Sequence, residues 1–204
     1  MLLLTIVMLV ISVHTFSVSS AGDVVVEITE PSILSTEPVV PTETIAKDPV
    51  DAAADELLKR LIWDGATAEE QVREIYRWTR SLLSYGGHSD RTDWRQTAYT
   101  MLTDGKGDCF GYYAVTKLLF ERLGIPNIDV QKVRNYEDDS DHFWSLVSVD
   151  GGETYYHFDA TPRYGDGDDF CLVTDAFLDA YSESHKGSHN RDKSLYPETP
   201  EESL

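Results

Sequence analysis

The sequence has 204 residues, of which 41% are hydrophobic and 11% aromatic. This length fits one globular domain with appendages, and the composition excludes a wholly disordered chain. Lys and Arg number 17 against 36 Asp and Glu, and the net charge of −19 repels phosphate backbones, so we expect no nucleic-acid partner. The two cysteines are too few for a disulfide-stapled scaffold or a four-ligand zinc site.

The chain opens on an apolar stretch that predicts a signal peptide. Residues 1–18 are almost continuously apolar, but the run is short for a membrane span. Ser19 and Ala21 are small residues at the two positions that signal peptidase recognises before its cleavage site. We therefore predict a signal peptide over 1–21 and a secreted protein. No Lys or Arg precedes the stretch, so a retained membrane anchor is the alternative, and membrane contact is expected only in that case. Residues 22–50 are rich in Pro, Thr and Glu and predict a linker.

The folded domain is predicted over residues 51–181 and begins with helices. Four segments carry helical patterns: 51–63, 68–85, 94–102 and 109–122. The last of them opens on Cys109 and stops before Gly124 and Pro126, which are typical of a helix end.

The second half of the predicted domain reads as strands. Four segments are rich in β-forming residues: 129–134, 143–149, 154–160 and 169–173. Asp150-Gly-Gly-Glu153 is a strong hairpin signal between the middle two. Residues 182–204 are polar and predict an extended tail. Helices followed by an antiparallel sheet indicate an α+β domain.

Cys109 is a candidate nucleophile because of its predicted place at a helix N-terminus. The positive end of the helix dipole and the unpaired amides there favour a thiolate, and the same amides can hold an oxyanion. The alternative is that Cys109 is a small buried hydrophobic residue, as most isolated cysteines are.

His142 and Asp159 are predicted to meet across the hairpin. If the hairpin closes through Gly151 and Gly152, Trp144 faces Asp159. His142 and Asp159 then lie on one face as diagonal neighbours about 7 Å apart, within side-chain reach. An imidazole and a carboxylate are what a thiol nucleophile needs. The argument requires an even number of loop residues, and an ordinary hairpin with exposed polar residues is the alternative.

Four strings together resemble the transglutaminase-like core of the papain-like superfamily: GDCFGYYA (107–114), LGIP (123–126), DHFW (141–144) and YHFDATP (156–162). The resemblance covers roughly residues 71–174. It implies Cys109 as nucleophile, His142 as general base and acid, and Asp159 as the carboxylate that orients the imidazole. It also implies a cysteine-bearing helix packed on an antiparallel sheet.

The resemblance offers Trp94 as a second oxyanion donor. In eukaryotic transglutaminases a tryptophan upstream of the cysteine helix donates its indole N–H to the oxyanion, and the segment 93–102 resembles that region, although the stretch between it and the cysteine is shorter here. A core tryptophan is the other interpretation of Trp94. The backbone amide of Cys109 would be the first donor.

Three further features weigh less. Cys171 could pair with Cys109, but a buried thiol is the simpler role. His157 shares the face of His142 and could replace it as base, or it could be a core imidazole. His185 and His189 have metal-like spacing only on a helix, which Gly187 argues against, and the acidic loops 137–141 and 166–169 lack a calcium-loop pattern, so we expect neither metal nor cofactor.

The sequence therefore predicts a secreted, cysteine-dependent acyl-transfer enzyme that acts on peptide or carboxamide bonds of a protein or peptide substrate through a thioester. Whether water or an amine resolves the thioester is left open. The alternative is a non-catalytic extracellular module that binds protein or cell-wall ligands through its cleft.

Overall fold

The computed structural model describes residues 48–162 and 169–204. The predicted signal peptide, nearly all of the predicted linker and most of the acidic loop 166–169 lie outside the described residues. The described part contains five α-helices: α1 (Pro49–Leu61), α2 (Ala68–Leu82), α3 (Trp94–Asp104), α4 (Cys109–Leu123) and α5 (Asp175–Ser184). None of these helices has the length and apolar character needed to cross a membrane.

Polar residues just before the helices set where they begin. The Asp48 carboxylate accepts a hydrogen bond from the Val50 amide at the start of α1, so the folded part begins slightly before the predicted residue 51. Thr67 and Glu70 form a capping box at the start of α2, each side chain accepting the other residue's backbone N–H. These bonds satisfy amides that a helix start leaves without partners.

The strands form two sheets. A four-stranded antiparallel sheet has the order β3 (Asn127–Gln131), β4 (Phe143–Val147), β5 (Tyr156–Phe158) and β6 (Cys171–Val173). A short parallel pair joins β1 (Ser84–Tyr85) to β2 (Lys106–Gly107), directly before α4. The predicted α+β class is confirmed.

The β4–β5 register is the one that the hairpin argument predicts, although the strands are shorter. Leu146 faces His157, and the neighbouring pairs keep this register. The connection is a loop over 148–155 and not a two-residue turn, because the Asp150 carboxylate accepts hydrogen bonds from the amides of Glu153 and Thr154. The loop still holds an even number of residues, so the faces of the two strands stay matched.

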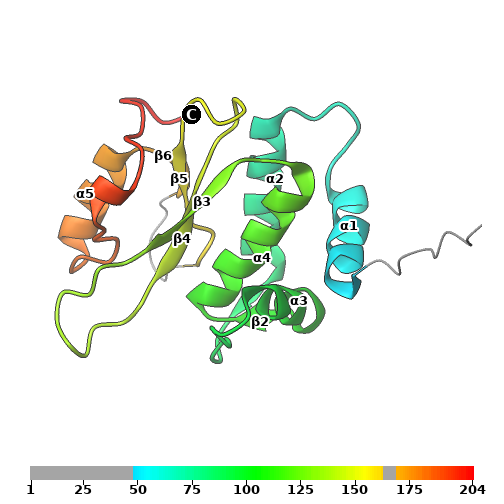
Figure 1. The fold of residues 1–204 in the computed structure, drawn as a ribbon, viewed down its shortest axis with the longest axis horizontal. Coiled ribbons are helices and arrows are strands. Elements are labelled where there is room, and N and C mark those ends of the chain that lie inside the picture. The colour runs from blue at the N-terminus through cyan, green and yellow to red at the C-terminus, as the bar shows by residue number, and fades with distance from the viewer. Residues whose placement is uncertain (1–47, 163–168) are drawn as a thin grey trace, which may run out of the picture. The chain divides into compact units, whose positions relative to one another are not determined.

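The core lies on both faces of the four-stranded sheet (Figure 1). On one face, α4 is almost wholly buried between the sheet and the other N-terminal helices, with Leu118, Leu119 and Phe120 fully buried. On the other face, α5 covers a second cluster that includes Trp144 and Phe170. A helix that is apolar all round needs such cover on every side.

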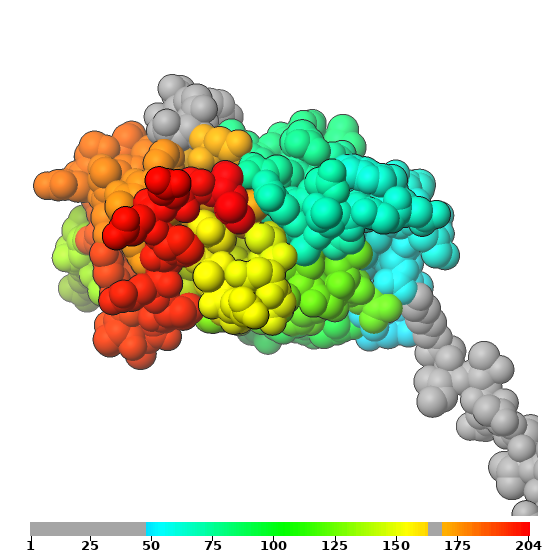
Figure 2. Space-filling model, turned by 90° about the horizontal axis from the view of Figure 1, so that it is seen from above, coloured from blue at the N-terminus to red at the C-terminus, as the bar shows by residue number. Residues whose placement is uncertain are grey.

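The expected extended tail after Tyr181 is wrong for its first part. Helix α5 continues to Ser184, the segment that follows is packed on the domain, and the His189 side chain is fully buried. Farther on, the Leu204 amide donates to the Leu172 carbonyl at 3.2 Å. Figure 2 shows the C-terminal residues, in red, lying against the residues around 150–160, in yellow. The polar composition of this segment suggests exposure to solvent, but polar groups can be buried when they are hydrogen-bonded, as they are here.

Candidate active site

Cys109 is the first residue of α4, and its position depends on tight packing around that helix start. The carboxylate of Asp108 caps the helix by accepting hydrogen bonds from the amides of Phe110 and Gly111. A Cβ on Gly111 would lie 2.9 Å from Ser89 Oγ and 3.2 Å from Met101 Sδ, so a larger residue would have to displace these side chains. The cap and this close packing together fix the start of α4, where Cys109 lies.

The thiol of Cys109 faces the main chain on both sides of His142. Its Sγ lies 3.7 Å from the carbonyl oxygen of Asp141, and the Phe143 amide also points to it. Burial, and after it the negative charges of Asp108 and Asp159, raise the pKa of Cys109 to about 11, against smaller opposing effects from Arg91 and the Phe143 amide.

The expectation that the helix N-terminus favours a thiolate is therefore wrong for this site. Asp108 takes the amides of the first turn and adds a negative charge next to the sulfur. The dipole effect is modest, whereas burial and two carboxylates act directly on the charged form. The thiol needs a base to give up its proton near neutral pH.

His142 and Asp159 form the pair that the register predicts. His142 directly precedes β4 and Asp159 directly follows β5, and His142 Nε2 lies 2.7 Å from Asp159 Oδ2. The other carboxylate oxygen, Oδ1, accepts a hydrogen bond of 2.9 Å from the Thr161 amide. Both side chains are buried, so this contact is largely shielded from water.

Asp141, the neighbour of His142, is fixed by two arginines. Arg91 and Arg134 each donate to its carboxylate at 2.6 Å. The hydrogen bond from Arg134, with the charge of both guanidinium groups, lowers the pKa of Asp141. This clamp holds the backbone whose carbonyl touches the thiol. Sequence reasoning missed it, because Arg91 lies 50 residues from Asp141.

His157 lies behind Trp144 and does not take the place of His142. The Trp144 ring stacks on His142 with centroids 5.6 Å apart, and its Nε1 donates to His157 Nδ1 at 3.0 Å. The second ring nitrogen of His157 meets Asp175 at 3.1 Å. Burial lowers the pKa of His157, which favours the neutral ring that this role needs. The structure thus supports the interpretation of His157 as a core imidazole.

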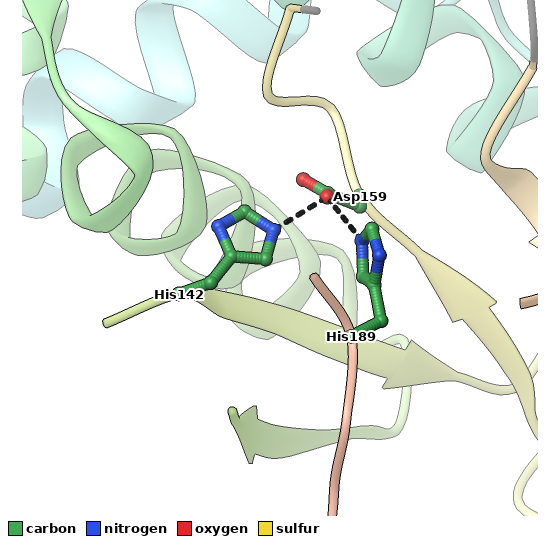
Figure 3. Close-up of side chains that lie close together, drawn as sticks. All are labelled: His142, Asp159 and His189. Carbon is green, nitrogen blue, oxygen red and sulfur yellow. Dashed lines mark hydrogen bonds and ion pairs between the residues drawn. The ribbon is translucent and has the colours of Figure 1, made fainter. Parts of the chain in front are cut away.

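The carboxylate of Asp159 is shared by a second histidine, which sequence reasoning considered only as a metal ligand beside His185. His189 Nε2 lies 3.0 Å from Asp159 Oδ2, and the rings of His142 and His189 meet edge to face with centroids 5.0 Å apart. Figure 3 shows Asp159 between the two imidazoles. In the sequence, His189 stands in a polar segment between Ser188 and Asn190, and no periodicity marks it as buried.

These three residues are also the group that could hold a metal ion among the described residues. One possible ligand atom from each of the three residues lies within 4.8 Å of the other two. His₂Asp is a donor set that zinc accepts. The distances of 2.7 and 3.0 Å to Asp159 Oδ2 are those of hydrogen bonds, which account for the grouping without an ion.

Cys109 and His142 line one cavity of about 510 Å³. The cavity is large enough for a peptide side chain and its flanking backbone. Tyr85 and Tyr136, which are 49% and 63% exposed, stand at its rim. The candidate nucleophile and His142, one member of the predicted pair, thus open onto a common space, whereas Asp159 is buried behind it.

Trp94 is not brought to this cavity. It stands at the start of α3, where the Nζ of Lys117 lies 4.7 Å from its ring centroid. Lys117 is eight positions beyond Cys109 on α4, about 12 Å along the helix axis. Of the two interpretations, a tryptophan packed against the core agrees with this placement, because Trp94 is partly buried against the main cluster.

Cys171 is a buried free thiol in β6, as expected, and both cysteines are free. Burial raises the pKa of Cys171 to about 12, so it is unreactive near neutral pH.

A sequence model of the transglutaminase-like superfamily matches residues 55–160, just over half of the chain. The chain belongs to the transglutaminase-like superfamily. Its helices and antiparallel sheet have the fold class expected for this superfamily, and the match ends one residue after Asp159. His189 therefore lies outside the segment that the superfamily model describes. No curated protein matches the sequence.

Three solved structures resemble this transglutaminase-like chain at low identity. One, a "putative cysteine protease" from Cytophaga hutchinsonii, is 19% identical with a TM-score of 0.43 over 55% of this chain and 37% of its own. A "putative protease" from Parabacteroides distasonis is 16% identical, with a TM-score of 0.39 over 55% and 23%. A TGase is 16% identical, with a TM-score of 0.45 over 79% and 45%. The chain spans less than half the length of each of these proteins.

Proposed function

We propose that this chain is a secreted cysteine-dependent acyl-transfer enzyme that acts on peptide or side-chain carboxamide bonds. The observation that supports it most is the geometry around His142: the Cys109 sulfur touches the main chain beside this residue, and Asp159 engages its Nε2. Membership of the transglutaminase-like superfamily agrees with this chemistry.

In the proposed reaction, His142 is the general base and Cys109 the nucleophile. Because Asp159 engages Nε2, Nδ1 is the ring nitrogen that takes the thiol proton as sulfur attacks the carbonyl carbon. The C–N bond breaks, the amine leaves with the proton from His142, and a thioester remains on Cys109. Water or a second amine then attacks the thioester and restores the thiol. Asp159 stabilises the imidazolium that forms in each half-reaction.

The pKa of Cys109, raised to about 11, supports proton transfer during attack over a preformed thiolate. The carbonyl oxygen becomes negative at that moment. Of the amides at the start of α4, Asp108 caps those of Phe110 and Gly111 and leaves that of Cys109 uncapped. We assign the Cys109 amide as the oxyanion donor and give Trp94 no part in it.

The test is to incubate the full chain with a mixture of peptides, with and without a primary amine, and to read mass changes in the peptides. Loss of a peptide bond, a gain of one mass unit at glutamine or asparagine, and addition of the amine distinguish cleavage, deamidation and transamidation. Cys109→Ala should abolish every change, and Cys171→Ser is the matched control that should keep it. A peptide-binding protein that changes no mass in any mixture would instead be a binding module.

Export is a separate part of the proposal and rests on residues 1–21. Expression of the full chain in a secreting host, followed by N-terminal sequencing of the protein in the medium, should give a first residue of Gly22. A protein that stays in the membrane fraction with Met1 or its neighbours intact would instead have kept the segment as an anchor.

A further inference from the structure

The C-terminal segment after α5 inserts a fully buried imidazole next to the proposed active site. The fully buried His189 side chain does more than fill apolar space, because its Nε2 lies 3.0 Å from Asp159 Oδ2. His142 Nε2 reaches the same oxygen at 2.7 Å. Two imidazoles from distant parts of the sequence therefore converge on one carboxylate oxygen.

The hydrogen-bond partners fix which atoms donate. An ionised carboxylate only accepts, so each Nε2 must carry the proton that points at Asp159. The Nδ1 atom of His189 lies 3.0 Å from Ser188 Oγ, and in a neutral ring this nitrogen accepts the hydroxyl proton. The chain of donors thus runs from Ser188 through His189 to Asp159.

The backbone and rings around His189 hold this arrangement. The His189 amide donates to Ser182 Oγ at 3.0 Å, which ties the segment to the end of α5. The ring of Phe170 stacks on the imidazole with centroids 5.6 Å apart, and the ring of Tyr181 meets it edge to face at 5.7 Å. A ring packed in this way cannot turn without disturbing its neighbours, so the donor keeps its direction.

We propose that His189 is a positioning residue: its Nε2–H holds the Asp159 carboxylate ionised and turned toward His142. The inference rests on the proposed function, because it gives Asp159 the role of orienting the base. Asp159 Oδ1 is already held by the Thr161 amide, and His189 supplies the hydrogen bond that Oδ2 needs besides the one from His142. Without this donor, the carboxylate is buried with fewer partners, which favours its neutralisation or its turning away.

The test measures how fast iodoacetamide alkylates Cys109 in the full chain between pH 5 and 11, with the labelled peptide identified by mass spectrometry. This readout needs no knowledge of the substrate. His189→Phe keeps a ring of similar size but removes the donor. His189→Gln places an amide nitrogen where Nε2 stood, whereas His189→Asn has the same amide one carbon too short to reach Asp159.

We expect His189→Phe and His189→Asn to lower the alkylation rate at pH 7 at least about tenfold, the lower end of what one hydrogen bond to a charged group contributes. His189→Gln should keep most of the rate. Thermal unfolding of each variant shows which are folded at the labelling temperature. If His189→Phe does not fold, the comparison of Gln with Asn decides the question, because these two variants differ by a single methylene.

A purely structural role for His189 would give equal alkylation rates in the folded variants at every pH, and this result would overturn the inference. So would a folded His189→Gln that is as slow as His189→Asn. Failure of the proposed function looks different: wild type and His142→Ala would then show the same pH profile, whatever stands at position 189.

Discussion

The His142→Ala variant tests the central electrostatic argument. In the structure, burial and the charges of Asp108 and Asp159 raise the pKa of Cys109 to about 11. In the mechanism proposed above, His142 receives the thiol proton during attack. Without the imidazole, only the spontaneously ionised thiolate can react. Its fraction at pH 7 is about one in ten thousand for this pKa, against about 3% for an ordinary cysteine with a pKa of about 8.5.

The expected rate follows from these two fractions. The thiolate is about 300-fold scarcer than that of an ordinary cysteine, but its higher basicity makes it about tenfold more nucleophilic at a Brønsted slope of about 0.4–0.5. His142→Ala should therefore be alkylated roughly 30-fold more slowly than a free cysteine peptide at pH 7. The rate should rise about tenfold per pH unit and level off only near pH 11.

The assay is iodoacetamide labelling over pH 6 to 11, with mass-spectrometric reading of the Cys109 peptide. The peptide of Cys171, whose pKa burial raises to about 12, is an internal control for unfolding, because it should stay unlabelled below pH 10. His185→Ala is the matched control: it removes another imidazole that lines the cavity, and its profile should equal wild type. A His142→Ala profile that levels off near pH 8.5 would refute the argument from burial and charge, and a wild-type rate at pH 7 would refute the role of His142 as base.

Asp159→Asn should lower the turnover of an identified substrate at least about tenfold, less than the roughly 10⁴-fold loss in a serine triad, because a thiol ionises more readily than a hydroxyl; rates equal to wild type in the folded variant would remove Asp159 from the mechanism. Cys171→Ser should keep activity, and intact mass under non-reducing conditions should show two free thiols; a disulfide to Cys109 would contradict this. Gly111→Ala should lower the free energy of unfolding by about 1–3 kcal/mol in urea, because its Cβ would crowd Met101 and Ser89, and an unchanged midpoint would contradict the packing argument. Dialysis against a chelator should leave the Cys109 alkylation rate unchanged, since hydrogen bonds account for the His142 and Asp159 contacts; a slower rate would point to a bound metal.

Local patterns in the sequence predict the fold and the His142–Asp159 pair well. Apolar spacing and end signals place α4 to within a residue, and the alternation of strand side chains carries His142 and Asp159 to the same face. The register survives a longer loop than predicted because only the parity of the loop matters for which face each side chain takes.

The contributions that come from distant segments could not be predicted. Arg91, which binds Asp141, and His189, which binds Asp159, lie in polar stretches without any periodic signal. Their partners are 50 and 30 residues away in sequence, and only the folded chain brings them together. The effect of Asp108 on the pKa of Cys109 could not be predicted for another reason. The capping carboxylate and a thiolate would both accept hydrogen bonds from the amides of the first turn, and the sequence does not say which of them does.

The sequence position of His189 has a consequence for the order in which the protein acquires its chemistry during synthesis. Cys109, His142 and Asp159 leave the ribosome before the segment after α5, and a domain generally folds as a unit. The unit that holds Cys109, His142 and Asp159 also includes His189, so it is complete only after residue 189 has been made. The thiol would acquire its full reactivity only when nearly the whole domain has been made, so the incomplete chain would not carry a reactive thiol during translation.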